Sequence, residues 1–295
     1  MSFAALLETL NSVIWSPALV FLCLAVGVYF TLTTLFLQVR CLPDMMRQIV
    51  SNKKSGSGVS SFESLMISLA GRVGVGNIAG VATAIAFGGP GAVFWMWAVA
   101  LLGSATSFIE CTLAQIYKEK DRDTGEYRGG PAYYIEKAYK HTRAGKFMLV
   151  YAVVFAVAMM LATSYFLPGI QANGVAAAMH NAWGTDVRIS AVVLGILLAV
   201  IIMGGVRRIA NFASLVVPLM AVVYILASIV IMFVNFDRID DVFSLIFRSA
   251  FDQEAMFSGM LGSAIMWGVK RGIYSNEAGQ GTGPQSAAAA EVSHP

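Results

Sequence analysis

Long apolar segments restrict this chain to a membrane fold. A helix that crosses a bilayer core about 30 Å thick needs roughly 20 mainly apolar residues. Six such segments run near residues 13–37, 62–87, 91–116, 147–170, 188–205 and 210–234, and a seventh begins near residue 255. Charged residues make up only 13% of the sequence, whereas roughly 25% is usual in soluble proteins. We therefore predict an all-α integral membrane protein with seven spans.

Lys and Arg in the connections between these spans predict the orientation. Fourteen of them follow the first, third and fifth spans, namely Arg40, Arg47, Lys53, Lys54, Lys118, Lys120, Arg122, Arg128, Lys137, Lys140, Arg143, Lys146, Arg207 and Arg208. The opposite side has only Arg188, Arg238 and Arg248. Because basic connections stay in the cytoplasm, we predict a multi-pass protein of the cell membrane with its N-terminus outside.

Glu8 and Asn11 precede the first span, so we expect a retained helix there and not a cleaved signal peptide.

The second and seventh spans carry the same polar interruption. GRVGVGNIAG at residues 71–80 and KRGIYSNEAG at residues 270–279 both read R-x4-N-x-A-G. Glycine lets a backbone leave helical geometry, and a helix unwinds inside a membrane only where protein or a polar cavity satisfies its backbone groups. The alternative is that these glycines merely allow close helix packing. Because Arg and Asn accompany them in both segments, we favour two discontinuous helices around a solute site.

The broken helix ends predict the kind of solute. The N-terminal end of one half-helix attracts an anion, and the free carbonyls of the other attract a cation. That combination suits a zwitterion bound together with a metal ion. In the seventh span, Gly279, Gly281, Gly283 and Pro284 are predicted to unwind the chain after Asn276, because glycine and proline are poor helix formers.

The two interrupted spans cross the membrane in opposite directions, which predicts an inverted-repeat transporter fold. Residues 1–61 hold an extra N-terminal helix and a cytoplasmic link, and residues 62–234 form the first five-helix repeat. Residues 235–295 hold an external loop and the first, broken helix of a second repeat. Arg72 and Arg271 are 199 positions apart. We therefore expect a C-terminally truncated chain from which most of the second repeat is missing.

Several long motifs resemble one known family. In chain order they are GRVGVGNIAGVA, GGPGAVFWMWAVALLG, TGEYRGGPAYYIEKA and RGIYSNEAGQGTGPQSAAAAE. They are similar to the sodium:alanine symporter family, whose members are also described as alanine or glycine:cation symporters, over nearly the whole chain. The resemblance implies secondary active transport, in which sodium is the coupling ion for symport of alanine or glycine into the cell. It also implies a five-plus-five inverted repeat of the amino acid-polyamine-organocation type, with no cofactor besides the sodium ion.

The stretch V-G-V-G-N at residues 73–77 is distantly similar to the first core helix of neurotransmitter:sodium symporters. That resemblance implies that backbone N–H groups hold the amino-acid carboxylate and that oxygens near the break hold sodium. The predicted substrate-binding residues are Gly74, Val75, Gly76, Asn77, Trp267, Ser275 and Asn276. The predicted sodium ligands are the carbonyls of Ala70 and Val73 and the side chain of Asn77. Arg72 departs from the pattern, because a neutral small residue occupies its place in those symporters.

Ionisable residues at membrane depth are rare and usually pair with one another or line a pathway. Arg72 and Arg271 lie at such positions, with Glu110 and Glu277 as candidate partners. We predict structural ion pairs among these four residues, and direct substrate contact by Arg72 is the alternative. Trp267 is predicted to form a hydrophobic wall of the pocket, and plain helix packing is its alternative.

Two prolines predict helix boundaries elsewhere in the chain. Pro131 is expected at the first position of a helix that lies on the cytoplasmic face. Pro168 is expected to end the fourth span, because proline cannot donate a helical hydrogen bond and clashes with the preceding turn.

Other functional classes fit the sequence less well. All eight Asp residues fall outside the apolar segments, and no nucleophile stands beside a base, so we predict that the chain is not an enzyme. A receptor or scaffold without a transported solute leaves two unwound helices unexplained. The 20 Lys+Arg and 17 Asp+Glu residues leave a net charge of only +3, which is too small to indicate nucleic-acid binding. The predicted partners are a small neutral amino acid, sodium and the lipid bilayer. The closest rival is a proton-coupled amino-acid carrier in which Glu110 or Glu277 carries the proton.

Overall fold

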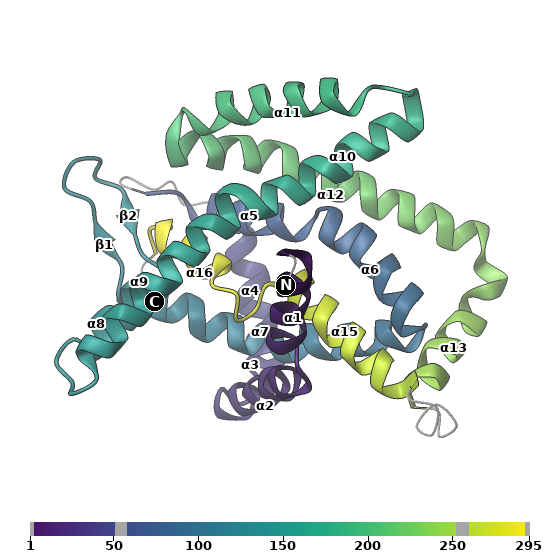
Figure 1. The fold of residues 1–295 in the computed structure, drawn as a ribbon, viewed down its shortest axis with the longest axis horizontal. Helices are drawn as coiled ribbons and strands as arrows, with labels where there is room; N and C mark the ends of the chain where they lie inside the picture. The colour runs from purple at the N-terminus through teal and green to yellow at the C-terminus, as the bar shows by residue number, and fades with distance from the viewer. Residues whose placement is uncertain (1–2, 51–57, 252–259, 293–295) are drawn as a thin grey trace. The chain divides into compact units, whose positions relative to one another are not determined.

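The computed structural model describes residues 3–50, 58–251 and 260–292, which are mostly helical (Figure 1). The helices are α1 (Phe3–Ile14), α2 (Pro17–Thr33), α3 (Leu37–Arg40), α4 (Leu42–Val50), α5 (Ser61–Arg72), α6 (Val75–Gly88), α7 (Gly91–Ile116), α8 (Pro131–Tyr139), α9 (Gly145–Leu161), the π-helical turn η1 (Ala162–Phe166), α10 (Leu167–Trp183), α11 (Val187–Ile202), α12 (Gly205–Val234), the 3-10 turn η2 (Phe236–Arg238), α13 (Ile239–Phe251), α15 (Met260–Asn276) and α16 (Thr282–Ala289). The short strands β1 (Glu119–Lys120) and β2 (Tyr127–Arg128) pair antiparallel.

The chain forms two compact units. The first unit comprises Met1–Leu42, Gly76–Ile109 and Ala227–Gly279, and the second comprises Pro43–Val75, Glu110–Leu226 and Gln280–Pro295. Three separate stretches of sequence therefore build each unit.

Five of the predicted spans are long and apolar enough to cross a membrane. In the described part of the chain they are Ala5–Thr33, Ser61–Gly88, Gly91–Ile116, Gly145–Trp183 and Gly205–Val234. The fifth predicted span is α11, an apolar helix of 16 residues, which is shorter than the roughly 20 residues that a bilayer core requires. The seventh is α15, of 17 residues, and its expected start near residue 255 lies outside the described residues. The five long helices confirm an all-α membrane architecture.

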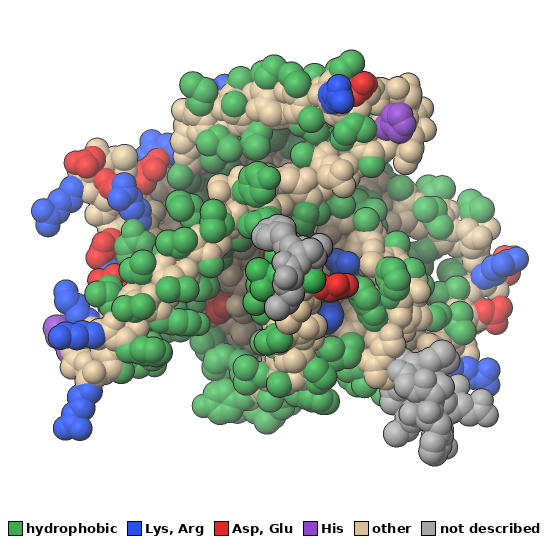
Figure 2. All heavy atoms as spheres, viewed as in Figure 1, with side chains coloured by type: hydrophobic (Ala, Val, Ile, Leu, Met, Phe, Trp, Pro, Cys, Tyr) green, Lys and Arg blue, Asp and Glu red, His purple; other side chains and the backbone are tan. Residues whose placement is uncertain are grey.

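Large apolar side chains are exposed along these helices, as the green side chains in Figure 2 show. Phe147 on α9, Leu215 on α12 and Phe233 on α12 are 70%, 75% and 73% exposed. Soluble proteins rarely expose broad apolar patches, whereas lipid chains solvate them without cost. The chain is therefore a multi-pass membrane protein.

Pro131 begins α8 as predicted, but the prediction that Pro168 ends the fourth span is wrong. The helix continues from α9 through η1 into α10 and ends at Trp183. The π-helical turn ends two positions before the proline, and the N–H of Leu167 bonds to the carbonyl of Ala162, five residues back. This wider turn rearranges the carbonyls that a proline ring would meet in a regular α-helix, so the chain passes Pro168 without breaking.

The core of the first unit joins α2, α7 and α15. Val20, Val99, Val269 and Ile273 are buried together. Gly268 on α15 has no room for a side chain, because a Cβ there would lie 2.6 Å from the carbonyl oxygen of Ala92. This close approach of α15 to α7 is the packing role that small residues play between membrane helices.

The core of the second unit joins α5, α12 and α16. Met66 of α5 is buried with Ala213 and Val217 of α12. Helix α16 packs on α5, and the Ser64 hydroxyl donates to the carbonyl of Ser286 at 2.7 Å. Residues 222 positions apart in sequence therefore hold the two half-helices α5 and α16 against each other.

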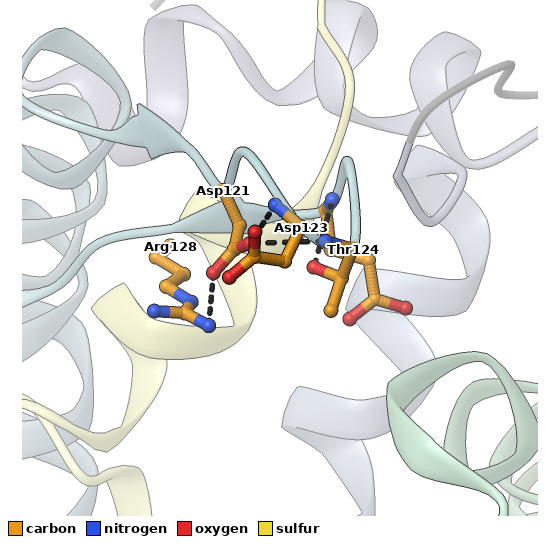
Figure 3. Close-up of polar contacts among 5 residues, drawn as sticks. Asp121, Asp123, Thr124 and Arg128 are labelled. Carbon is orange, nitrogen blue, oxygen red and sulfur yellow. Dashed lines mark hydrogen bonds and ion pairs between the residues drawn. The ribbon is translucent and has the colours of Figure 1, made fainter.

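A polar hairpin made of β1 and β2 also belongs to the second unit (Figure 3). The carboxylate of Asp121 accepts hydrogen bonds from the N–H groups of Asp123 at 2.7 Å and Thr124 at 3.0 Å. Arg128 forms an ion pair with the same carboxylate. The two backbone hydrogen bonds, and then Arg128, lower the pKa of Asp121. Asp121 thus closes this turn by local hydrogen bonding, which is a common use of Asp in turns.

Candidate functional site

The first predicted break lies between α5 and α6. Helix α5 ends at Arg72, Val73 has φ −100° and ψ 75°, and α6 begins at Val75. The N–H of Val75 donates to the side-chain oxygen of Gln171 at 3.0 Å. A Cβ on Gly74 would lie 3.0 Å from that same oxygen. Gln171, on α10, therefore satisfies a backbone donor that the break leaves without a helical partner.

The second predicted break lies between α15 and α16. Helix α15 ends at Asn276, and Glu277, Gly279 and Gly281 have φ of 57°, 80° and 82°. Left-handed backbone of this kind is natural for glycine and uncommon for Glu. Both predicted interruptions are therefore real helix breaks. Gly283 and Pro284 were expected to be unwound as well, but they lie in the first turn of α16, where a proline needs no hydrogen-bonded N–H.

Within the first unit, the end of α15 meets the start of α6. The Ser275 hydroxyl donates to the side-chain oxygen of Asn77, and the Asn77 side-chain nitrogen lies 3.4 Å from the carbonyl of Ser275. A Cβ on Gly76 would lie 2.6 Å from the ring of Tyr274. Gly76, Asn77 and Ser275 are half-buried. Three of the predicted substrate-binding residues are thus brought together, although Asn77 and Ser275 are 198 positions apart in sequence.

Asn276 lies next to this pair in sequence but bonds elsewhere. Its side-chain nitrogen donates to the carbonyl of Val99 at 3.0 Å, and its oxygen accepts from the N–H of Ala278 at 2.9 Å. It also lines a mainly apolar cavity of about 160 Å³ beside α2 and α7, together with Cys23 and Thr106. Asn276 therefore fixes the C-terminal end of α15 and holds it on α7.

Trp267 stands further back along α15. It lies eight positions before Ser275, which is about 12 Å along a helix axis. Its ring stacks on Phe87 with centroids 5.0 Å apart, and the charged groups of Lys270 and Arg271 lie 5.8 and 5.7 Å from the ring centroid. The tryptophan thus offers its π face to two cations, a role that the sequence did not suggest.

The other predicted charges have neighbours that the sequence did not single out. The Arg72 guanidinium donates to the hydroxyl of Ser68 at 2.7 Å. Tyr134 on α8 lies close to Glu110, and burial first and then this carboxylate raise the pKa of Tyr134. The ion pairs predicted among Arg72, Glu110, Arg271 and Glu277 stay predictions. The predicted sodium site also stays a prediction, because Ala70 and Val73 belong to the second unit and Asn77 belongs to the first.

Two residues that contact the breaks were missed by sequence reasoning. Gln171 directly follows the predicted fourth span, and Asn173 is a second amide two positions later, so the sequence did not single it out. Tyr274 was part of the quoted motif, but only the fold shows that its ring covers Gly76.

Comparison with known proteins identifies the family of this chain. A model of the sodium:alanine symporter family matches residues 1–295. A putative sodium/proton-dependent alanine carrier protein of Bacillus subtilis is 54% identical over 99% of this chain and 58% of its own length. A probable sodium/glutamine symporter of the same organism is 44% identical over 97% of this chain and 58% of its own length. A sodium/alanine symporter of Methanococcus maripaludis is 43% identical over 100% of this chain and 65% of its own length.

The chain thus spans less than two thirds of the length of these curated relatives. The family model, in contrast, matches the chain from its first residue to its last. The two broken helices, the apolar spans and this match lead to one conclusion: the chain belongs to the sodium:alanine symporter family.

Proposed function

We propose that this protein is a secondary active transporter that couples the inward movement of sodium to the uptake of a small neutral amino acid, alanine or glycine. The observation that carries the proposal is the pair of helix breaks, one before Asn77 and one after Asn276. Discontinuous membrane helices place backbone ends and carbonyls where they bind solutes and ions. The family match and the relatives named for sodium and alanine support the same function.

The residues of the first break are proposed to recognise the amino acid. The N-terminal turn of α6 carries the positive end of a helix dipole, which attracts the substrate carboxylate. In our proposal the substrate-binding residues are Gly74, Val75, Gly76, Asn77, Ser275, Asn276 and Trp267. Gln171 already accepts from the N–H of Val75. A carboxylate that binds there therefore displaces the Gln171 oxygen or binds beside it.

Sodium is proposed to bind through oxygen atoms alone. The carbonyls of Ala70 and Val73 lie at the C-terminal end of α5, where the negative end of the dipole favours a cation. Hard cations prefer carbonyl, amide and hydroxyl oxygens, and Asn77 adds a side-chain oxygen.

We further propose the inverted-repeat fold, from the motif that the two broken spans share. We also propose an N-terminus outside the cell, from the positive charge of the connections.

Two alternatives have specific support. One relative is named a sodium/proton-dependent carrier, and Glu110 lies near Tyr134, so proton coupling through Glu110 or Glu277 is the first. Another relative is named for glutamine, which makes a larger neutral amino acid the second candidate substrate.

Uptake by the intact protein in proteoliposomes tests the proposal. We expect accumulation of labelled alanine when sodium is high outside and low inside, and no accumulation when choline replaces sodium. Accumulation driven by a proton gradient without sodium would instead support the proton-coupled carrier. Competition by unlabelled glycine, alanine and glutamine then identifies the substrate, because the best substrate competes at the lowest concentration.

A further inference from the structure

A second cavity lies in the second unit, among α7, α8 and α9. Its volume is about 410 Å³, which falls in the range of about 300–1,000 Å³ that is usual for small-molecule sites. The lining residues are Leu113, Tyr117, Tyr134, Ile135, Ala138, Tyr139, Met148 and Tyr151. Four of these eight are tyrosines. The cavity is therefore lined by aromatic rings and aliphatic side chains, and the tyrosine hydroxyls are the polar side-chain groups of these residues.

Basic side chains cluster beside this cavity, in the turn between α8 and α9. Lys140, His141, Arg143 and Lys146 are all exposed, and Figure 2 shows the blue side chains gathered where Figure 1 places this turn. No Asp or Glu occurs in the sequence between Glu136 and Asp186. The turn thus presents a concentrated positive charge at the start of a membrane span.

Lys137 on α8 precedes this cluster and contacts the chain that follows α7. Its ammonium donates to the carbonyl of Tyr117 at 2.6 Å and pairs with Glu119 at 2.8 Å. This pairing, helped by Lys140, lowers the pKa of Glu119. Lys137 therefore fixes α8 to the end of α7, while the exposed Arg143 and Lys146 lie where α9 begins.

An apolar surface continues from the cavity along α9. Phe147 and Val150 are 70% and 61% exposed, and Gly145–Trp183 is long and apolar enough to span the membrane. The basic turn thus leads directly into α9, which contributes Met148 and Tyr151 to the cavity and exposes an apolar surface. Tyrosine and the long Lys and Arg side chains prefer the boundary between headgroups and hydrocarbon.

We propose that this cavity and the adjoining basic turn bind an anionic phospholipid, with its phosphate at Arg143 and Lys146 and an acyl chain among the four tyrosines. Charge complementarity selects this occupant, since basic pockets beside membrane helices bind anionic headgroups. The apolar lining explains why the ligand carries a hydrocarbon chain. The transported amino acid is a poor match, because the cavity wall has no charged group for its carboxylate or ammonium. This inference does not depend on the proposed transport activity.

Lipid titration of the detergent-solubilised intact protein, followed by native mass spectrometry, tests the site. The probes are phosphatidylglycerol and phosphatidylcholine with identical acyl chains. We expect phosphatidylglycerol to bind preferentially. The variant Arg143→Gln with Lys146→Gln should weaken phosphatidylglycerol binding about 30-fold, which is about 2 kcal/mol, since each basic residue near a membrane surface contributes about 1 kcal/mol. The matched control, Lys120→Gln with Arg122→Gln in the β1–β2 hairpin, removes the same charge and should change binding little.

A second variant tests the cavity itself. Ala138→Phe fills part of the volume from an exposed helical position, so it should fold and should weaken the binding of both lipids. Circular dichroism and thermal unfolding verify that each variant is folded. Millimolar inorganic phosphate should not displace the lipid, because the chain supplies part of the binding.

Three results would overturn the proposal. Equal binding of the two lipids would remove the headgroup site. Phosphatidylglycerol binding that survives Arg143→Gln with Lys146→Gln, or that falls equally in the hairpin control, would show that this turn is not the site. Unchanged binding in Ala138→Phe, or displacement by inorganic phosphate, would show that no acyl chain occupies the cavity.

Discussion

In the first interrupted span the helix stops before the shared asparagine, whereas in the second it stops after it. The first gap, Val73–Gly74, precedes Asn77, which lies in the first turn of α6. The second gap, residues 277–281, follows Asn276, the last residue of α15. The two segments share R-x4-N-x-A-G but place their asparagines at opposite ends of a half-helix.

The positions of the glycines account for this difference. Before its asparagine, the first segment has Gly74 and Gly76, where the second has Ile273 and Ser275. After its asparagine, the second segment has Gly281, where the first has an alanine at the matching position. Glycine costs about 1 kcal/mol relative to alanine within a helix, so each helix breaks on the side where it has the additional glycines.

The two asparagines consequently have different surroundings. Asn77 accepts from a hydroxyl on α15, whereas Asn276 donates to a carbonyl of α7 and accepts from the N–H of Ala278 in its own following turn. We infer that the second break is closed in part by its own residues and that the first is completed by side chains from elsewhere.

The largest expected effect is on stability at the second break. Gly281→Ala places a Cβ at φ 82° and 2.6 Å from the ring of Phe155, so left-handed strain of about 1–2 kcal/mol adds to overpacking of about 1–3 kcal/mol. Gly279→Ala is the matched control, because its φ is 80° but no atom lies within 4 Å. Thermal unfolding in detergent should show a much larger loss for Gly281→Ala. Equal losses would mean that packing around Gly281 contributes nothing.

The next effect separates the two asparagines. Asn77→Ala should lower the affinity for sodium or alanine about 10- to 100-fold, since a hydrogen bond to a charged group contributes about 1.5–3 kcal/mol. Asn276→Ala should instead lower the unfolding free energy by about 1 kcal/mol for each lost hydrogen bond. Uptake kinetics and thermal unfolding of both variants measure the two quantities. If Asn77→Ala lost only stability, the comparison between the asparagines would fail.

A smaller effect is expected at the cap of the first break. Gln171→Leu removes the acceptor of the Val75 N–H, and an unsatisfied donor at a helix N-terminus costs about 1 kcal/mol. Gln171→Asn keeps a neutral amide oxygen and serves as the control. Melting temperatures should therefore fall in the leucine variant and fall less in the asparagine variant. A leucine variant as stable as the parent would show that water accepts the hydrogen bond of the Val75 N–H equally well.

These comparisons also show what the sequence can reveal. Glycine-rich interruptions predicted both breaks because helix propensity is local. The bonding of Asn77 to Ser275 and of Val75 to Gln171, 198 and 96 positions away, depends on tertiary packing, which periodicity does not encode. Pro168 was misassigned for a related reason, since a π-helical turn accommodates a proline that local rules treat as a helix end.

Disulfide cross-linking tests the central claim, that the start of α6 meets the end of α15 through Asn77 and Ser275. The intact protein, with Cys23, Cys41 and Cys111 replaced by Ala, would carry Asn77→Cys with Ser275→Cys. A second protein would carry Asn77→Cys with Asn276→Cys as control. Because disulfides form only between closely placed Cβ atoms, mild oxidation should cross-link the first pair rapidly and the second slowly. Faster cross-linking of the Asn276 pair would contradict the account.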